Sequence, residues 1–167
     1  MKTIQAIQTR RSTRRFAYKP IAKDILIQLV DSGRRAPSGR NEQPIEYIVI
    51  DDPKAIHEIA GLTDSGRFAE DAGALIILIA RDVKYYIEDG SAASQNVLLA
   101  ATAQGLASCW IAGDKKYYAA QICARLDVPE DRKLVSILAI GTADEAPTEK
   151  PRPPIGEQLH WNRFRAR

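Results

Sequence analysis

One uninterrupted apolar run, residues 72–80 (AGALIILIA), constrains the fold of this chain more than any other feature. The run is far too short to cross a bilayer as a helix. A short apolar run without polar alternation is typical of a strand that is covered on both faces. We therefore expect a strand over residues 74–80 that is buried on both sides.

Helix and strand signals alternate along the rest of the chain. The helix 88–104 is rich in alanine, so we expect it to pack closely in a central position. Gly33 and Gly61 are expected to end the second and third helices. The alternation indicates an α/β or α+β architecture, and 167 residues with 45% hydrophobic content suit one domain over 1–167. The sequence predicts helices over 3–9, 23–32, 53–60, 88–104 and 115–126, and strands over 47–50, 108–111 and 135–140.

The charge of the chain is nearly balanced but unevenly distributed. A net charge of +3 argues against a general nucleic-acid binder. Basic residues gather near both ends of the sequence, which favours discrete anion sites. The polar, basic start lacks the apolar core of a signal peptide, so we expect a cytoplasmic protein with no membrane partner. Cys109 and Cys123 lack metal-ligand spacing, and we interpret them as reduced thiols with no metal.

The segment 10–16 (RRSTRRF) is the sharpest local signal. Guanidinium groups bind phosphate oxygens bidentately, and a serine hydroxyl or backbone N–H completes such a site. The alternative is a solvated basic turn, which is what most charge runs are. The same two interpretations apply to the basic pair in 150–152. The candidate phosphate ligands are Arg10, Arg11, Ser12, Arg14, Lys150 and Arg152.

Two loops have the composition of ligand-binding segments. Residues 36–44 (APSGRNEQP) offer hydroxyl, amide and backbone groups between prolines. Ala112 and Gly113 are small enough for a flat ligand to approach the backbone. The alternative for both loops is an ordinary connection between elements.

The end of the chain, residues 150–167, is expected to be an extended tail. Its prolines at 151, 153 and 154 exclude a helix there and a central strand. The tail nevertheless carries Leu159, Trp161 and Phe164, whose apolar surfaces need cover. We therefore expect the tail to dock on its own chain or on a partner.

Familiar catalytic motifs are missing from the sequence. His57 and His160 have no placed nucleophile or metal-spaced partner, and no Walker loop or nucleophile elbow occurs. This pattern fits an enzyme whose reactive centre is a cofactor, and it fits a non-enzyme equally well.

Four segments, in the same order, together resemble the FMN-dependent nitroreductases. They are residues 10–16, residues 36–44, residues 92–113 (AASQNVLLAATAQGLASCWIAG) and the tail from Lys150. The resemblance implies an α+β fold with a mixed central sheet flanked by helices. It also implies a homodimer that exchanges its tails and holds FMN at the subunit interface.

The resemblance also implies a role for each matching residue. Those matching Arg10, Ser12 and Arg14 contact the flavin phosphate and the pyrimidine end of the ring, and those matching Lys150 and Arg152 close around the phosphate. Arg14 is our candidate for a cation near flavin N1 and O2, where positive charge favours reduction.

The loop residues receive roles from the same resemblance. Pro37, Ser38 and Asn41 match a loop that reaches the flavin of the other subunit, and the backbone of Ala112 and Gly113 matches the segment facing flavin N5 and O4. Relatives often place Asn and Lys in the stretch that is Asp64–Phe68 here, which leaves open a flavin contact by Ser65 or Arg67.

The implied activity is hydride transfer from NAD(P)H through FMN to a nitroaromatic, a quinone or a similar small acceptor, with ping-pong kinetics. Three alternatives stay open at this point. The chain could be a dehalogenase or other specialised flavoenzyme of the same fold, a flavin-binding protein without turnover, or a basic nucleic-acid-binding module.

Overall fold

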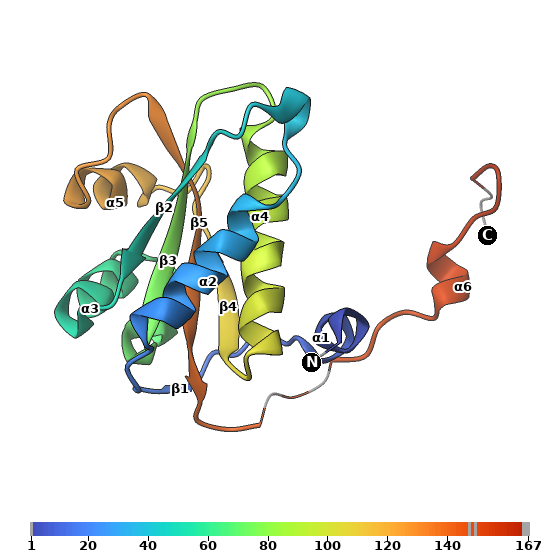
Figure 1. The fold of residues 1–167 in the computed structure, drawn as a ribbon, viewed down its shortest axis with the longest axis horizontal. Helices are drawn as coiled ribbons and strands as arrows, with labels where there is room; N and C mark the ends of the chain where they lie inside the picture. The colour runs from blue at the N-terminus through green and yellow to red at the C-terminus, as the bar shows by residue number, and fades with distance from the viewer. Residues whose placement is uncertain (1, 147, 149, 165–167) are drawn as a thin grey trace.

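The computed structural model describes residues 2–146, 148 and 150–164, and its elements alternate as the sequence predicts (Figure 1). In chain order they are α1 (Thr3–Thr9), β1 (Phe16–Ala17), α2 (Lys23–Arg34), the 3₁₀ helix η1 (Gly39–Asn41), β2 (Ile45–Ile50), α3 (Pro53–Leu62), the 3₁₀ helix η2 (Arg67–Asp71), β3 (Ala74–Arg81), α4 (Tyr86–Ala103), β4 (Ala107–Ala112), α5 (Ala119–Arg125), β5 (Arg132–Ala143) and α6 (Ile155–Gln158).

The sheet is built around β5, the last strand along the chain. It pairs with β3 and with β4, while β2 extends the sheet beyond β3 and the short β1 pairs with the end of β5. All four ladders are antiparallel. Among the described residues, parallel pairing occurs only at an isolated bridge between Ser12 and Ser108. The mixed sheet that the resemblance implied is therefore antiparallel except at that bridge.

Strand β3 confirms the prediction from the apolar run. Its residues from 74 to 80 are all buried, and successive side chains enter two different cores. Ile77 and Ile79 pack in a cluster that includes residues of α3 and α5. Ile76 and Leu78 pack in a second cluster with residues of α2 and α4. Figure 1 shows these helix pairs on opposite sides of the sheet, which explains why the strand needs no polar position.

Helix α4 lies against the sheet, as its small side chains predict. Ala93, Val97 and Ala101 are buried on its inner face. The one hydroxyl pair at this contact is satisfied, because Ser94 Oγ lies 2.8 Å from Ser136 Oγ of β5 and also donates to the carbonyl of Gly90.

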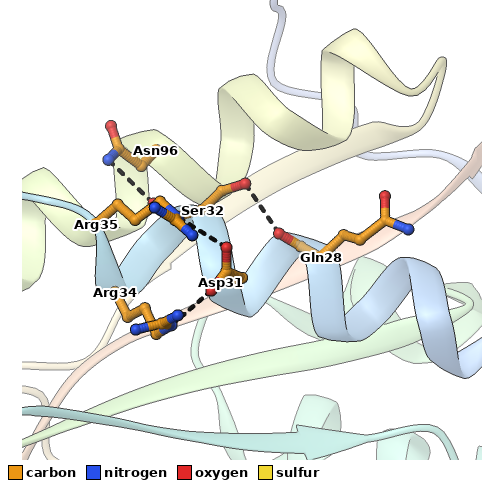
Figure 2. Close-up of polar contacts among 6 residues, drawn as sticks. All are labelled: Gln28, Asp31, Ser32, Arg34, Arg35 and Asn96. Atoms are coloured by element: carbon orange, nitrogen blue, oxygen red, sulfur yellow. Dashed lines mark hydrogen bonds and ion pairs between the residues drawn. The ribbon is translucent and has the colours of Figure 1, made fainter.

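Polar contacts tie the last turn of α2 to α4 (Figure 2). Asn96 of α4 donates from Nδ2 to the carbonyl of Ser32 at 3.1 Å. Asp31 accepts from Arg34 at 2.6 Å and from Arg35 at 2.8 Å. Hydrogen bonds from Arg35 and then Arg34 lower the pKa of Asp31. The exposed pairs contribute little stability.

Two glycines that the sequence analysis assigned as helix ends lie inside helices instead. Gly33 is within α2, and a Cβ there would lie 2.8 Å from Tyr47 Oη and 2.8 Å from Val97 Cγ2. Gly33 is therefore needed for close packing of α2 on its neighbours. Gly61 lies within α3, which ends at Leu62.

Other differences concern short elements. The helix predicted over 115–126 spans only Ala119–Arg125, because residues 115–118 form a turn with Lys115 at a φ of 57°. The two-residue β1 and the four-residue α6 were not predicted. No described helix is both long enough and apolar enough to span a membrane.

The tail extends away from the rest of the chain (Figure 1). Its described apolar residues are strongly exposed: Ile155 at 75%, Trp161 at 73% and Phe164 at 78%. His160 and Phe164 contact each other with ring centroids 4.5 Å apart. Of the two docking surfaces that the sequence left open, the described residues of the tail do not use their own chain, and docking on a partner stays a prediction.

Candidate functional site: a cationic cavity

The N-terminal arginine cluster and the start of the tail line one cavity of about 400 Å³. These segments lie more than a hundred residues apart in the sequence, yet all six candidate phosphate ligands meet here. Every charged side chain that lines the cavity from the described residues is a cation. The lining residues are Ile7, Gln8, Arg10, Arg11, Ser12, Arg14, Thr148, Lys150 and Arg152.

Backbone pairing fixes the arginine segment in place. Helix α1 ends at Thr9, and the chain then runs extended beside the start of β4. There the N–H of Thr13 donates to the carbonyl of Ser108 at 2.9 Å. Phe16 next pairs with Ala143 at the end of β5. The backbone of the arginine segment is therefore fixed by hydrogen bonding to β4 on one side and to β5 on the other.

The cluster divides into cavity residues and one surface residue. Arg11 lines the cavity and donates from Nη1 to the carbonyls of Gln8 and Arg10. Arg15 does not line it, because its guanidinium lies 3.1 Å from Glu145 and 3.9 Å from Asp144. Several guanidinium groups and an ammonium around one space form a donor set that suits a phosphate dianion.

Arg14 connects the cavity to the segment that follows α3. Its guanidinium carbon lies 6.0 Å from the centroid of the Phe68 ring, which in turn stacks on Phe16 at 6.3 Å. Arg67 points elsewhere, since its Nε lies 3.7 Å from Glu70, and it does not line the cavity. Neither does Ser65, whose hydroxyl donates to Asp64.

The thiol of Cys109 lies in β4 near the arginine segment. The side chain is buried, with 2% of the residue exposed. Burial raises the pKa of the Cys109 thiol, and the charge of Arg14, a contact with Ser12 and the charge of Arg10 oppose that rise. Cys109 is buried and Cys123 is half-buried.

We predict that alkylation by iodoacetamide at neutral pH labels Cys123 before Cys109. Cys123 is half-buried and Cys109 is buried, and burial raises the pKa of both thiols, so access decides the order. Peptide mass spectrometry over time measures each rate, and labelling in denaturant gives the control in which both react. Equal rates in the native protein would contradict the burial of Cys109.

The loop of residues 36–44 lies at the opposite end of α4 from α1 (Figure 1), and the cationic cavity is lined by residues of α1 and of the segment that follows it. Pro37 and Ser38 line a separate cavity of about 110 Å³. Arg40, Asn41 and Gln43 have φ values of 54°, 57° and 45°. Such left-handed conformations at residues other than glycine cost roughly 1–3 kcal/mol each and cluster at functional sites.

Ala112 and Gly113 lie at the far end of β4, outside the cationic cavity. The carbonyl of Ala112 accepts from the Tyr118 hydroxyl. Gly113 is buried, and a Cβ there would lie 2.7 Å from Leu134 Cγ and 2.9 Å from the carbonyl of Val135. Close packing against β5 therefore requires glycine at position 113.

Three cavity residues were not among the sequence candidates. Ile7 and Gln8 lie one helical turn before Arg10 and Arg11, so the spacing of α1 was a usable signal. Thr148 carried no signal, because nothing in the sequence places it beside α1.

Comparisons with known proteins show the family and the fold of the chain. The family model described as "Putative TM nitroreductase" matches residues 2–163. A protein of Archaeoglobus fulgidus named "Putative NADH dehydrogenase/NAD(P)H nitroreductase" is 28% identical over 145 residues, which cover 83% of each chain. A crystal structure of that name from Parabacteroides distasonis is 28% identical, with a TM-score of 0.90 over 97% of this chain and 98% of that one.

A third similar protein was solved with a bound flavin. The crystal structure of a "putative nitroreductase in complex with fmn" from Desulfovibrio desulfuricans is 30% identical, with a TM-score of 0.84 over 98% of each chain. The matched segment of the family model includes the arginine cluster and the basic pair of the tail, and the fold is shared along nearly the whole length. The chain therefore belongs to the nitroreductase family of NAD(P)H-dependent oxidoreductases.

Proposed function

We propose that the chain binds FMN noncovalently and acts as an NAD(P)H-dependent reductase of nitroaromatics, quinones or similar small acceptors. The observation that carries this proposal is the meeting of the N-terminal arginines with the basic pair of the tail around one cavity. The FMN complex of the similar Desulfovibrio desulfuricans protein supports it.

The proposed roles follow from the chemistry of each side chain. Arg10, Arg11, Lys150 and Arg152 hold the phosphate through charge-assisted hydrogen bonds. Arg14, whose guanidinium lies 6.0 Å from the centroid of the Phe68 ring, places positive charge at the pyrimidine end of the flavin. When bound, FMN supplies the two-electron chemistry that the protein side chains lack.

The proposed site is shared between two copies of the chain. If residues 37–41 and the arginine cluster contact the same flavin, they cannot both come from one chain. Most of the length of α4 separates them, and its 18 residues measure roughly 27 Å. The exposed apolar residues of the tail also need cover that the described part of the chain does not give. Both observations support a homodimer.

The proposal predicts a yellow protein with one FMN per subunit and ping-pong kinetics. The absorption spectrum of the purified protein gives the flavin content, and a screen of NADH and NADPH against a quinone and a nitroaromatic gives the kinetics. Parallel double-reciprocal lines are expected, because both substrates use the same face in turn. A colourless protein that does not bind added FMN, or that binds DNA with strong salt dependence, would contradict it.

A further inference from the structure

A buried carboxylate lies at the base of the loop of residues 36–44. Asp89 is in the first turns of α4, and only 6% of the residue is exposed. Its Oδ1 accepts a hydrogen bond from the backbone N–H of Gly39 at 2.8 Å. Its Oδ2 is also buried and has no hydrogen-bond partner among the residues that the structure describes.

The loop backbone at Gly39 is in close van der Waals contact with the segment that leads into α4. A Cβ on Gly39 would lie 2.7 Å from Cδ2 of Tyr85 and 3.1 Å from its Cβ, so the loop backbone rests on that ring. Asp89 and Ser38 line the same small cavity beneath the loop. Asp89 therefore meets the loop next to the residues that we assign to flavin contact.

The two halves of the loop are held by different side chains. Arg81 holds the second half, since its Nη2 donates to the carbonyl of Glu42 at 2.6 Å. Ser38 accepts at Oγ from the N–H of Gln43 at 3.0 Å, which closes the loop on itself. The bond to Asp89 fixes the first half to the helix. The loop includes three residues in the left-handed conformation, which is unfavourable for residues other than glycine. The loop therefore needs these surrounding contacts to keep its conformation.

A carboxylate at this buried position is expected to lower the free energy of unfolding compared with a small apolar side chain. Burying an ionised group away from water destabilises a fold unless hydrogen bonds or charges compensate it. The neighbouring buried positions of α4 are filled by small residues such as Gly90 and Ala93. The geometry points to Asp89 as a positioning residue that presents Pro37, Ser38 and Asn41 to the FMN of the partner subunit, an inference that rests on the function proposed above.

The first test replaces Asp89 in the full-length holoenzyme. Asp89→Ala removes the acceptor for Gly39 and is expected to weaken FMN binding roughly tenfold. Asp89→Asn keeps an acceptor oxygen at the same place and is expected to restore most of the affinity. Glu88→Ala, at the exposed neighbour in the same turn, is the matched control with wild-type affinity. Circular dichroism melting and sedimentation confirm that each variant is folded and dimeric.

The second test asks whether Asp89 acts across the interface. The test uses a mixed dimer with Asp89→Ala in one tagged subunit and Arg14→Ala in the other. If each site combines Arg14 of one subunit with the loop of its partner, one site carries both substitutions and the other carries neither. One FMN per dimer should then bind with wild-type affinity. If both sites of this mixed dimer are weakened, the loop acts within its own chain and the inference is wrong.

The outcomes separate this inference from the proposed function. Wild-type FMN affinity in folded Asp89→Ala, beside a wild-type protein that binds FMN, overturns the role of Asp89 alone. A wild-type protein that binds no FMN overturns both. If Asp89→Ala does not fold, Asp89→Leu takes its place in both tests, because it removes the acceptor for Gly39 but fills the space of the side chain, and wild-type FMN affinity in folded Asp89→Leu overturns the role of Asp89.

Discussion

Truncation after Gly156 is expected to yield a monomer that has lost its FMN, although Lys150 and Arg152 remain. The cut removes Leu159, Trp161 and Phe164, which are 45%, 73% and 78% exposed in the single chain. Fully burying one such side chain contributes about 1.5–3 kcal/mol, so three of them account for a large part of a dimer interface. Loss of the dimer then removes the partner loop from each flavin site, because binding and assembly are linked.

Sedimentation and flavin absorbance measure both consequences of this truncation in one preparation. A cut after Phe164 is the control, because it keeps all three apolar side chains and Lys150 and Arg152. The full-length double variant Trp161→Ala/Phe164→Ala tests the same contacts without shortening the chain. A monomer with full FMN occupancy would show that one chain builds the whole site.

Replacing Arg14 by Ala is expected to weaken FMN binding by about 10- to 150-fold, since a charge-assisted hydrogen bond contributes about 1.5–3 kcal/mol. The reduction potential of the bound flavin should also fall, because a cation near the ring favours the reduced, more negative form. Fluorescence titration gives the affinity, and equilibration with a reference dye gives the potential.

Arg15→Ala is the matched control for Arg14→Ala. Arg15 is the next residue, but its guanidinium pairs with Glu145 and Asp144 on the surface and does not line the cavity. Exposed ion pairs contribute little, so its removal should leave FMN affinity and potential unchanged. Equal effects of the two substitutions would mean that the cluster acts as a general basic patch.

Much of the fold could be predicted because the decisive elements are local patterns. The strand over 74–80 and the alanine-rich helix over 88–104 follow from apolar continuity and side-chain size, and β3 and α4 lie within a few residues of those ranges. By contrast, β1 is two residues long and exists only because Phe16 and Ala17 pair with the end of β5. The prediction that Gly33 ends its helix was wrong, because glycine is needed there for close packing against Tyr47 and Val97, which are distant in sequence.

The candidate site was predictable in its parts but not in its assembly. The chemistry of guanidinium groups singled out residues 10–16, and composition singled out residues 36–44. Only the family resemblance joined the first segment to Lys150 and Arg152, because no local rule brings a proline-rich tail beside α1. Asp89 escaped notice for a physical reason: an acidic residue in the first turns of a helix usually stays exposed near the positive end of the helix dipole.

The central position of β5 has a consequence for how the chain is made. Strand β3 needs a partner on both edges, and one of these is supplied by residues 132–143. While the ribosome is still adding those residues, the apolar edge of β3 is open to pairing with other nascent chains. Folding must therefore follow synthesis of most of the polypeptide instead of accompanying it, and the long-range pairing makes it slow. Refolding yield should depend steeply on protein concentration, and a circular permutant that begins near Glu130 would have β5 synthesised before β3.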